Sequence, residues 1–187
     1  MNGTDLKFIR EMAGRDYDGK ETDGKLSILD LSDAKIVEAG SAYYSDRDDG
    51  FIYTSNDKLG DYVFNDCYGL TSLTLPSSVT EIGEDAFMNC RGLTNFTIPS
   101  GVTSIGTSAF FCCYGLISLT IPSSVTAIGS RAFNDCSRLT SIYAYMEKLP
   151  ETGQIYFLDV TKRNVRFMYQ KELVMLIFGQ VLAISRI

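Results

Sequence analysis

The amino-acid sequence predicts a solenoid that is mostly β-structure, with short helical or 3-10 turns, 23-residue coils and one N-terminal helix. Three observations support this prediction. A segment that begins at Leu70 returns nearly unchanged at Leu93 and Leu116, apolar residues recur at fixed positions in each copy, and a helical pattern precedes the copies. This period lies in the range of solenoid repeats. One coil cannot bury its apolar face alone, so stacked neighbours create the core.

The first 57 residues are expected to open the solenoid with a capping helix, a strand and an acidic loop. One face of the predicted helix carries Leu6, Ile9 and Ala13. Gly14 then provides a stop signal. Residues 25–36 carry leucines at the spacing L-x-x-L-x-L and are predicted to join the same solenoid as a strand. Residues 38–57 are rich in Tyr and Asp and are predicted to form a loop.

Residues 58–146 are predicted to be the repeats themselves. In the first complete copy, LTSLTLP carries L-x-x-L-x-L, the strand signature of leucine-rich repeats, and Pro76 ends the strand because it has no N–H. VTEIG alternates as a second short strand that turns at Gly83. EDAFMNC is too short for a helix and is predicted as one helical or 3-10 turn. The residues expected to face inward are Leu70, Leu73, Leu75, Val79, Ile82, Ala86, Phe87 and Cys90.

The repeats resemble a known family. The elements LPSSVT, IG, AF and C recur at the same spacing, and the half-copy Lys58–Gly69 carries the end of the pattern. They are similar to the BspA-like leucine-rich repeats of bacterial cell-surface proteins, and the resemblance covers roughly residues 1–164. It implies secretion or surface exposure and a non-catalytic binding or adhesion module. It provides no catalytic residues, and no cofactor or metal is expected.

The C-terminal end departs from this pattern. Residues 147–164 are predicted to be a terminal partial repeat and residues 165–187 an aberrant tail, because VRFMYQKEL fits no coil position. Reverse translation of Asn164–Leu173 with one inserted base yields NCTLYVPKGT, which resembles a closing strand of the family. The tail is therefore interpreted as a frameshift product, with a genuine divergent tail as the alternative. Because a solenoid needs a polar end cap, such a tail is expected to promote aggregation.

Composition narrows the classes of function. The chain has no His, no Trp and a net charge of −6. The absence of His excludes Ser-His-Asp and Cys-His catalysis and imidazole metal sites, so an enzyme is not expected. No basic stripe is present, and nucleic acid is not an expected partner. The apolar run near the C-terminus is too short to span a membrane. No signal peptide is visible, so the chain as written is expected in the cytoplasm, although the family is secreted or on the cell surface.

Two motifs have plain structural interpretations. Cys67, Cys90, Cys113 and Cys136 recur every 23 residues. They lack the C-x₂₋₄-C spacing of metal sites. A disulfide between stacked coils is geometrically open, but the favoured interpretation is a column of small buried thiols. Cys112 breaks this ladder and is expected to point outward. SDRDDG at Ser45–Gly50 lacks EF-hand spacing and is predicted to be a solvated acidic loop.

The predicted binding surface is the Ser/Thr-rich ribbon formed by the residues between the inward-facing leucines of successive strands. Solenoids bind partners on such extended surfaces, and Tyr is favoured at interfaces. A protein or a glycan, on a host or a cell surface, is the expected ligand. The candidate contact residues are Thr74, Thr97, Thr120, Tyr143 and Tyr145. Plain solvated strand surface is the alternative for the ribbon, and a truncated, frameshifted gene relic without independent function is the alternative for the chain.

Overall fold

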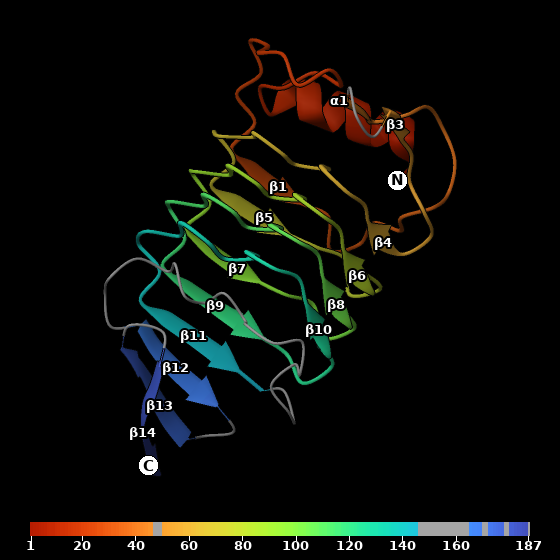
Figure 1. The fold of residues 1–187 in the computed structure, drawn as a ribbon. Helices are drawn as coiled ribbons and strands as arrows, with labels where there is room; N and C mark the ends of the chain where they lie inside the picture. The colour runs from red at the N-terminus through yellow and green to blue at the C-terminus, as the bar shows by residue number, and fades with distance from the viewer. Residues whose placement is uncertain (47–49, 146–164, 170–171, 178–179, 187) are drawn as a thin grey trace.

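The described coils stack along one axis into a solenoid with two columns of parallel strands (Figure 1). This computed structural model describes residues 1–46, 50–145, 165–169, 172–177 and 180–186. The first column contains β1 (Ile28–Asp30), β5 (Ser72–Thr74), β7 (Asn95–Thr97), β9 (Ser118–Ile121) and β11 (Ser141–Ala144). The second column contains β4 (Lys58–Leu59), β6 (Glu81–Ile82), β8 (Ser104–Ile105) and β10 (Ala127–Ile128).

The repeat positions are in register from coil to coil. β7 pairs with β9 so that Phe96 lies opposite Leu119, and β9 pairs with β11 so that Leu119 lies opposite Ile142. Because side chains on a strand alternate between two faces, this register directs every leucine-type position inward and every intervening Ser or Thr outward. The predicted strand at residues 25–36 is confirmed as β1, which pairs in parallel with β5.

The core is a set of side-chain columns that run along the solenoid axis. All eight residues predicted to face inward in the first complete copy are buried. Four phenylalanine rings stack, with centroid distances of 5.6 Å between Phe64 and Phe87, 4.9 Å between Phe87 and Phe110, and 5.5 Å between Phe110 and Phe133. Such offset-stacked pairs contribute about 0.5–1.5 kcal/mol beyond the burial of their area. Each coil therefore contributes one ring to a continuous aromatic stack.

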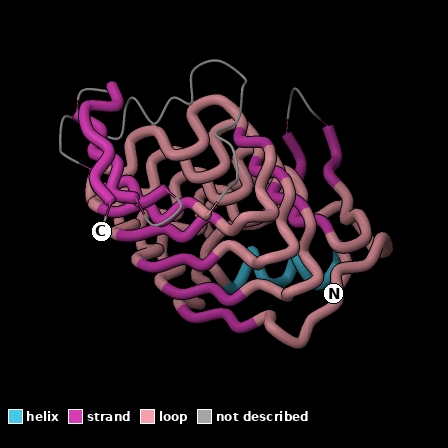
Figure 2. The backbone as a smooth tube through the Cα atoms, turned by 90° about the horizontal axis from the view of Figure 1, so that it is seen from below, coloured by secondary structure: helices cyan, strands magenta, loops and turns pink. Residues whose placement is uncertain are grey.

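The turn between the two strand columns consists of short hydrogen-bonded turns, as expected for a segment too short for a helix. In the first complete copy, the N–H of Met88 donates to Asp85 and that of Cys90 donates to Phe87, both at 3.0 Å. Asp85 and Asn89 adopt φ values of 50° and 61°. The same two positions are left-handed in the neighbouring coils, which gives the coil its tight corners. In Figure 2 most of the coil path lies outside helices and strands.

Helix α1 (Gly3–Met12) closes the N-terminal end of the stack. Asn2 caps it, since its side chain accepts the N–H of Thr4 while Asp5 accepts the N–H of Asn2 at 2.8 Å. This reciprocal arrangement satisfies donors that the first turn would otherwise leave unpaired. The predicted helix is confirmed, and Leu6 is buried on its inner face. Within the described residues, no helix has both the length and the apolar character needed to cross a membrane.

The cap bonds to the first coil through side chains. In later coils, the carbonyl groups of Glu84, Ala86 and Met88 accept N–H groups from the preceding coil. The equivalent carbonyls of the first coil belong to Asp61, Val63 and Asn65. The Tyr43 hydroxyl donates to Asp61 at 2.7 Å. The fully buried Arg10 guanidinium donates to Val63 at 3.0 Å and to Asn65 at 3.5 Å. Arg10 and Tyr43 thus supply the donors that a preceding coil would have supplied.

The structure adds one element to the predicted loop at residues 38–57. Strands β2 (Tyr44–Asp46) and β3 (Gly50–Ile52) pair in an antiparallel hairpin, with Tyr44 opposite Ile52. Residues 47–49, in the middle of SDRDDG, lie outside the described residues. Tyr43 is completely buried next to the hairpin. Because the Tyr43 hydroxyl donates to the carbonyl of Asp61, this tyrosine anchors the segment to the first coil.

At the C-terminal end, β12 (Val165–Tyr169) pairs in parallel with β11, although no coil position was expected for this sequence. Ser141 lies opposite Arg166, so the two strands are offset by 25 residues and not by the 23 of the repeats. β13 (Glu172–Ile177) and β14 (Gln180–Arg186) then add antiparallel strands. The predicted partial repeat at residues 147–164 lies outside the described residues. The origin of residues 165–187 in a shifted reading frame stays a prediction.

Glycine occupies the same repeat position at Gly69, Gly92 and Gly115, and substitutions there test whether the close spacing of the coils requires it. A Cβ atom at Gly115 would lie 2.5 Å from the carbonyl oxygen of Arg91, whereas at Gly69, in the same repeat position of the first coil, a Cβ atom would meet nothing within 4 Å. We therefore expect Gly115→Ala to lower the free energy of unfolding by about 1–3 kcal/mol. Gly69→Ala should leave it unchanged or raise it slightly. Urea denaturation measures both, and equal effects would show that coil spacing does not constrain this column.

The hydrogen bonds of Arg10 in the cap predict that its substitution strongly lowers the free energy of unfolding. Arg10→Met leaves the buried carbonyls of Val63 and Asn65 without their side-chain donor, and we expect a loss of about 2–4 kcal/mol in the free energy of unfolding. Arg138→Met, at an exposed arginine of the last complete repeat, is the control and should have little effect. Urea denaturation again provides the measurement. A small loss for Arg10→Met would mean that the hydrogen bonds from Arg10 contribute little to holding the cap on the first coil.

Candidate functional site

The outward face of the first strand column carries two rows of residues. One row runs through Asp30, Thr74, Thr97, Thr120 and Tyr143. The other runs through Ile28, Ser72, Asn95, Ser118 and Ser141. Thr97, Thr120 and Tyr143 are direct neighbours on paired strands. The structure thus places four of the five predicted contact residues in one row, and Tyr145 follows just after β11.

A groove opens in this face between β5 and β7. It has a volume of about 340 Å³. Its lining comprises Ser72, Leu73, Thr74, Leu75, Ser77, Asn95, Thr97, Pro99 and Ser100. The strands on either side lie next to each other, and the N–H of Thr94 approaches the carbonyl of Thr71 at 3.5 Å, but they form no regular ladder. Because β7 and β9 do form a ladder, the groove marks the interruption in the column.

The predicted contact residues divide at this groove. Thr74 and Thr97 line it and are exposed. Thr120, Tyr143 and Tyr145 lie beyond it, and the two tyrosines are 40% and 52% exposed. Ser77 and Ser100 line the groove but were not among the predicted contacts, because they follow the strand-ending prolines in a segment that looks like a plain turn. The recurrence of that serine in successive copies is the signal that could have identified them.

Hydroxyl groups in the repeats belong to two structural classes. Thr80, Thr103 and Thr126 donate to carbonyl groups 23 residues earlier, at 3.2, 3.1 and 3.3 Å. Two threonines of the predicted ribbon also donate to the preceding coil: Thr140 to Ile117, 23 residues earlier, at 3.2 Å, and Thr71 to Ser27, 44 residues earlier, at 2.9 Å. These hydroxyls hold coils together. The polar side chains that line the groove make no hydrogen bond to the described part of the chain, and so they are available to a ligand.

From β1 to β11, the only charged side chain in the two rows is Asp30, at the N-terminal end of the first row. Asp30 lies opposite Thr74, across the β1–β5 pair. Its carboxylate accepts the N–H of Ser32 at 2.9 Å, and this hydrogen bond lowers the pKa of Asp30 below its ordinary value. The carboxylate is therefore ionised at neutral pH. The negative charge of Asp30 therefore lies beside the groove, whereas no charged side chain belongs to the lining of the groove.

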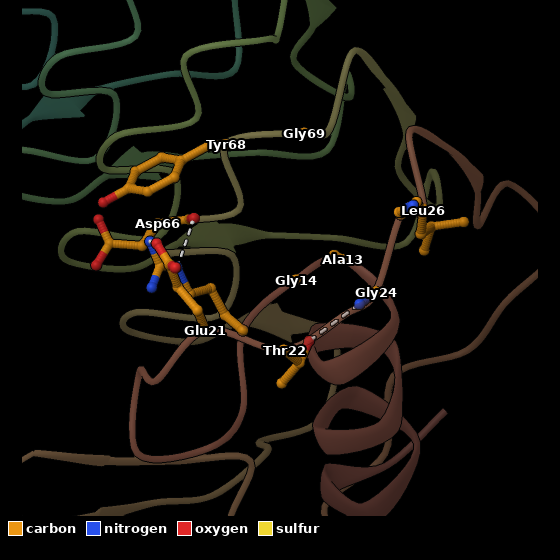
Figure 3. Close-up of a pocket in the computed structure, with 11 residues that line it drawn as sticks. Ala13, Gly14, Glu21, Thr22, Gly24, Leu26, Asp66, Tyr68 and Gly69 are labelled. Atoms are coloured by element: carbon orange, nitrogen blue, oxygen red, sulfur yellow. Dashed lines mark hydrogen bonds and ion pairs between the residues drawn. The ribbon is translucent and has the colours of Figure 1, made fainter.

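A second, smaller pocket lies where the cap meets the first coil. Figure 3 shows Thr22 and Gly24 on one side of it and Asp66 and Tyr68 on the other. Its volume is about 160 Å³, below the usual range of ligand sites. Arg15, which also lines it, donates to the carbonyl of Asp66 at 3.2 Å and pairs with Glu21 at 3.4 Å. The Arg15 guanidinium also lies 4.5 Å from the centre of the Tyr68 ring. These contacts join the cap to the repeats.

The cysteine ladder is a column of buried free thiols, as interpreted from the sequence. The thiols of Cys90, Cys113 and Cys136 donate to the carbonyls of Phe64, Phe87 and Phe110 at 3.1, 3.1 and 3.2 Å. Burial raises the pKa of Cys67 to about 11 and that of Cys136 to about 12. The ladder therefore holds protonated thiols that bond one coil to the previous one. Among the described residues, no cluster of His, Cys, Asp or Glu could hold a metal ion.

The expectation that Cys112 points outward is wrong. Cys112 is buried, with 8% of its surface exposed, and the hydroxyl of Tyr114 donates to its sulfur at 3.2 Å. Its φ of 58° matches the left-handed backbone of Asn89 in the preceding coil. The Cys112 side chain is therefore buried in contact with Tyr114 and does not point into solvent.

The repeats identify the family of this protein. A sequence profile for the BspA type leucine-rich repeat region, with six copies, matches residues 57–174. The chain belongs to the BspA-type leucine-rich repeat family. This confirms the resemblance seen in the repeats, and the match runs across Asn164.

Three solved structures are similar to this BspA-type chain. A leucine-rich repeat protein from Bacteroides ovatus is 30% identical over 62% of this chain and 28% of its own, with a TM-score of 0.53. The leucine-rich repeat protein of T. pallidum is 29% identical over 53% of this chain and 55% of its own, with a TM-score of 0.36. A leucine-rich cell surface protein from Faecalibacterium prausnitzii is 23% identical over 71% of this chain and 51% of its own, with a TM-score of 0.29.

This chain spans less than two thirds of the length of each of these proteins. The Bacteroides structure supports the solenoid fold of the BspA-type repeats. Among curated proteins, no sequence matches this chain.

The raised thiol pKa values predict a loss of stability in alkali. A thiol with an ordinary pKa of 9.0 deprotonates in the unfolded chain, whereas Cys136 in the folded chain keeps its proton until about pH 12. The stabilisation is complete below pH 9 and disappears as the pH rises toward 12, because the unfolded state then binds fewer protons than the native state. We expect the fall in unfolding free energy between about pH 8 and pH 10.5 to be smaller in Cys136→Val than in wild type. Urea denaturation at both pH values measures it, and equal falls would contradict the assignment.

Proposed function

We propose that this chain is a non-catalytic binding module of the bacterial cell-surface type, which presents the Ser/Thr-rich face of its first strand column to a protein or a glycan. Membership of the BspA-type family is consistent with a repeat module that binds another molecule. Location at the cell surface and a role in adhesion are part of the same proposal.

One observation carries the proposal: the polar side chains that line the groove on this face have no hydrogen-bond partner among the described residues, whereas other hydroxyls of the repeats do. Thr74 and Thr97 are exposed on the face, while Thr80 and Thr103 bond to the neighbouring coil. The stacked coils hold the face rigid, so binding requires little loss of conformational freedom. Tyr143 adds an aromatic anchor in the same row.

The tyrosines at the far end of the face provide the test. The purified chain is applied to an array that carries extracellular matrix proteins and oligosaccharides, and affinities are measured for each probe that binds. We expect the double variant Tyr143→Ala/Tyr145→Ala to bind at least about fivefold more weakly, because tyrosines are enriched among the interface residues whose truncation costs more than about 1 kcal/mol. Tyr53→Ala, at an exposed tyrosine outside the strand face, is the matched control.

Two results would contradict the proposal. Equal affinity of the double variant and wild type for every bound probe would exclude the tyrosine end of the face. Absence of binding to all probes by a cooperatively folded chain is the result expected of a gene relic without independent function.

A further inference from the structure

We infer that the groove between β5 and β7 is a binding site for a neutral oligosaccharide. This inference rests on the proposed function and narrows it, from a face that binds a protein or a glycan to one groove and one class of glycan. The groove combines polar side chains that make no hydrogen bond to the described residues, a lining without charge and one half-buried proline ring.

The polar lining suits a ligand that has hydroxyl groups of its own. The six side chains are those of Ser72, Thr74, Ser77, Asn95, Thr97 and Ser100. Every one of them can both donate and accept a hydrogen bond. A sugar hydroxyl has the same dual character, so each can pair with the lining in either direction. The lining does not demand a ligand of fixed donor or acceptor pattern, such as a phosphate or a carboxylate.

Electrostatics disfavours an anionic ligand. No lysine or arginine lines the groove. Asp30 lies opposite Thr74 at its flank, and the whole chain has a net charge of −6. A sulfated or uronic acid sugar would therefore enter a negative potential without a cation to pair with. An uncharged sugar is not repelled by the negative potential and needs no cation as a partner.

The apolar part of the lining and the backbone distinguish a sugar from a protein segment. Leu73 and Leu75 belong to the lining, but their side chains are directed to the core and each is 6% exposed. The half-buried ring of Pro99 is therefore the apolar surface that can pack against the C–H face of a sugar ring. Protein interfaces usually depend on buried Trp, Tyr or Arg anchors, and the lining has none. β5 and β7 belong to adjacent coils and are in direct contact. An extended peptide therefore cannot enter between them and pair with both as an additional strand.

The size of the groove fits a short stretch of a sugar chain. Its volume of about 340 Å³ lies at the lower end of the usual range of ligand clefts. The groove runs parallel to the strands. Ser72 and Asn95, on β5 and β7, lie at one end, and Ser77 and Ser100, which follow these strands, lie at the other. A longer glycan can therefore extend beyond the groove over the outward face.

Isothermal titration with defined sugars tests the inference. The probes are cellohexaose, maltohexaose and chitohexaose as neutral sugars, and hexagalacturonic acid and a heparin hexasaccharide as anionic ones. We expect at least one neutral probe to bind and the anionic probes not to. The double variant Thr74→Val/Thr97→Val keeps side-chain shape and strand propensity but removes two hydroxyls. We expect it to lower the affinity at least tenfold.

Thr107→Val, outside the groove and the strand face, is the control and should bind as wild type does. Urea denaturation of all three proteins confirms that they fold equally. Binding of a neutral probe that is unchanged in the double variant overturns the inference, as does equal binding of neutral and anionic probes. If only protein probes bind, through Tyr143 and Tyr145, the inference fails while the proposed function stands. If nothing binds, both fail.

Discussion

The direction of the hydrogen bonds between coils is the constraint on which the rest of the structure depends. In each turn segment alternate N–H groups donate to the next coil, and the carbonyl groups that accept such bonds face the previous coil, as in the bonds from Phe64 to Ala86 and from Phe87 to Ala109. A stack of such turns has one end that lacks donors and one that lacks acceptors. Buried carbonyls without partners are costly, so the N-terminal end requires donors. Arg10 supplies them, and no carboxylate of the described residues forms an ion pair with it. Its guanidinium also lies 4.7 Å from the centre of the Tyr44 ring.

The same constraint assigns structural roles to most repeated positions. The ladder cysteines donate to the phenylalanine carbonyls, one threonine per coil donates to the threonine carbonyl of the coil before it, and glycine permits close approach of neighbouring backbones. A residue that repeats is therefore no indication of function by itself. The groove is informative because the hydroxyls of Thr74 and Thr97 repeat and yet hold nothing together. This contrast, and not the abundance of Ser and Thr, is what marks the face as a binding surface.

Sequence periodicity predicted the coil and its core because each inward position, such as Phe87, meets its own equivalent one period away. It could not predict contacts made only once. The bonds from Arg10 to Val63 and from Tyr43 to Asp61 join residues with no repeat relation. The burial of Cys112 was missed because it depends on a left-handed backbone and a covering tyrosine. Thr74 and Thr97 were predicted from strand alternation, but the groove between them arises from a missing ladder that no residue pattern signals.

The two ends of such a solenoid cannot be closed by the same chemistry. The N–H groups of Ser108, Phe110 and Cys112 donate to Ser130, Ala132 and Asn134 in the last complete repeat. By the same geometry, the turn that begins at Arg131 directs its own N–H groups onward, so a C-terminal cap must offer carbonyl or carboxylate acceptors where the N-terminal cap offers a guanidinium and a hydroxyl. β12 continues only the strand column, through its parallel pairing with β11. Strand addition extends the sheet, but it cannot replace acceptors on the turn side, and these are two separate requirements for a stable C-terminal end.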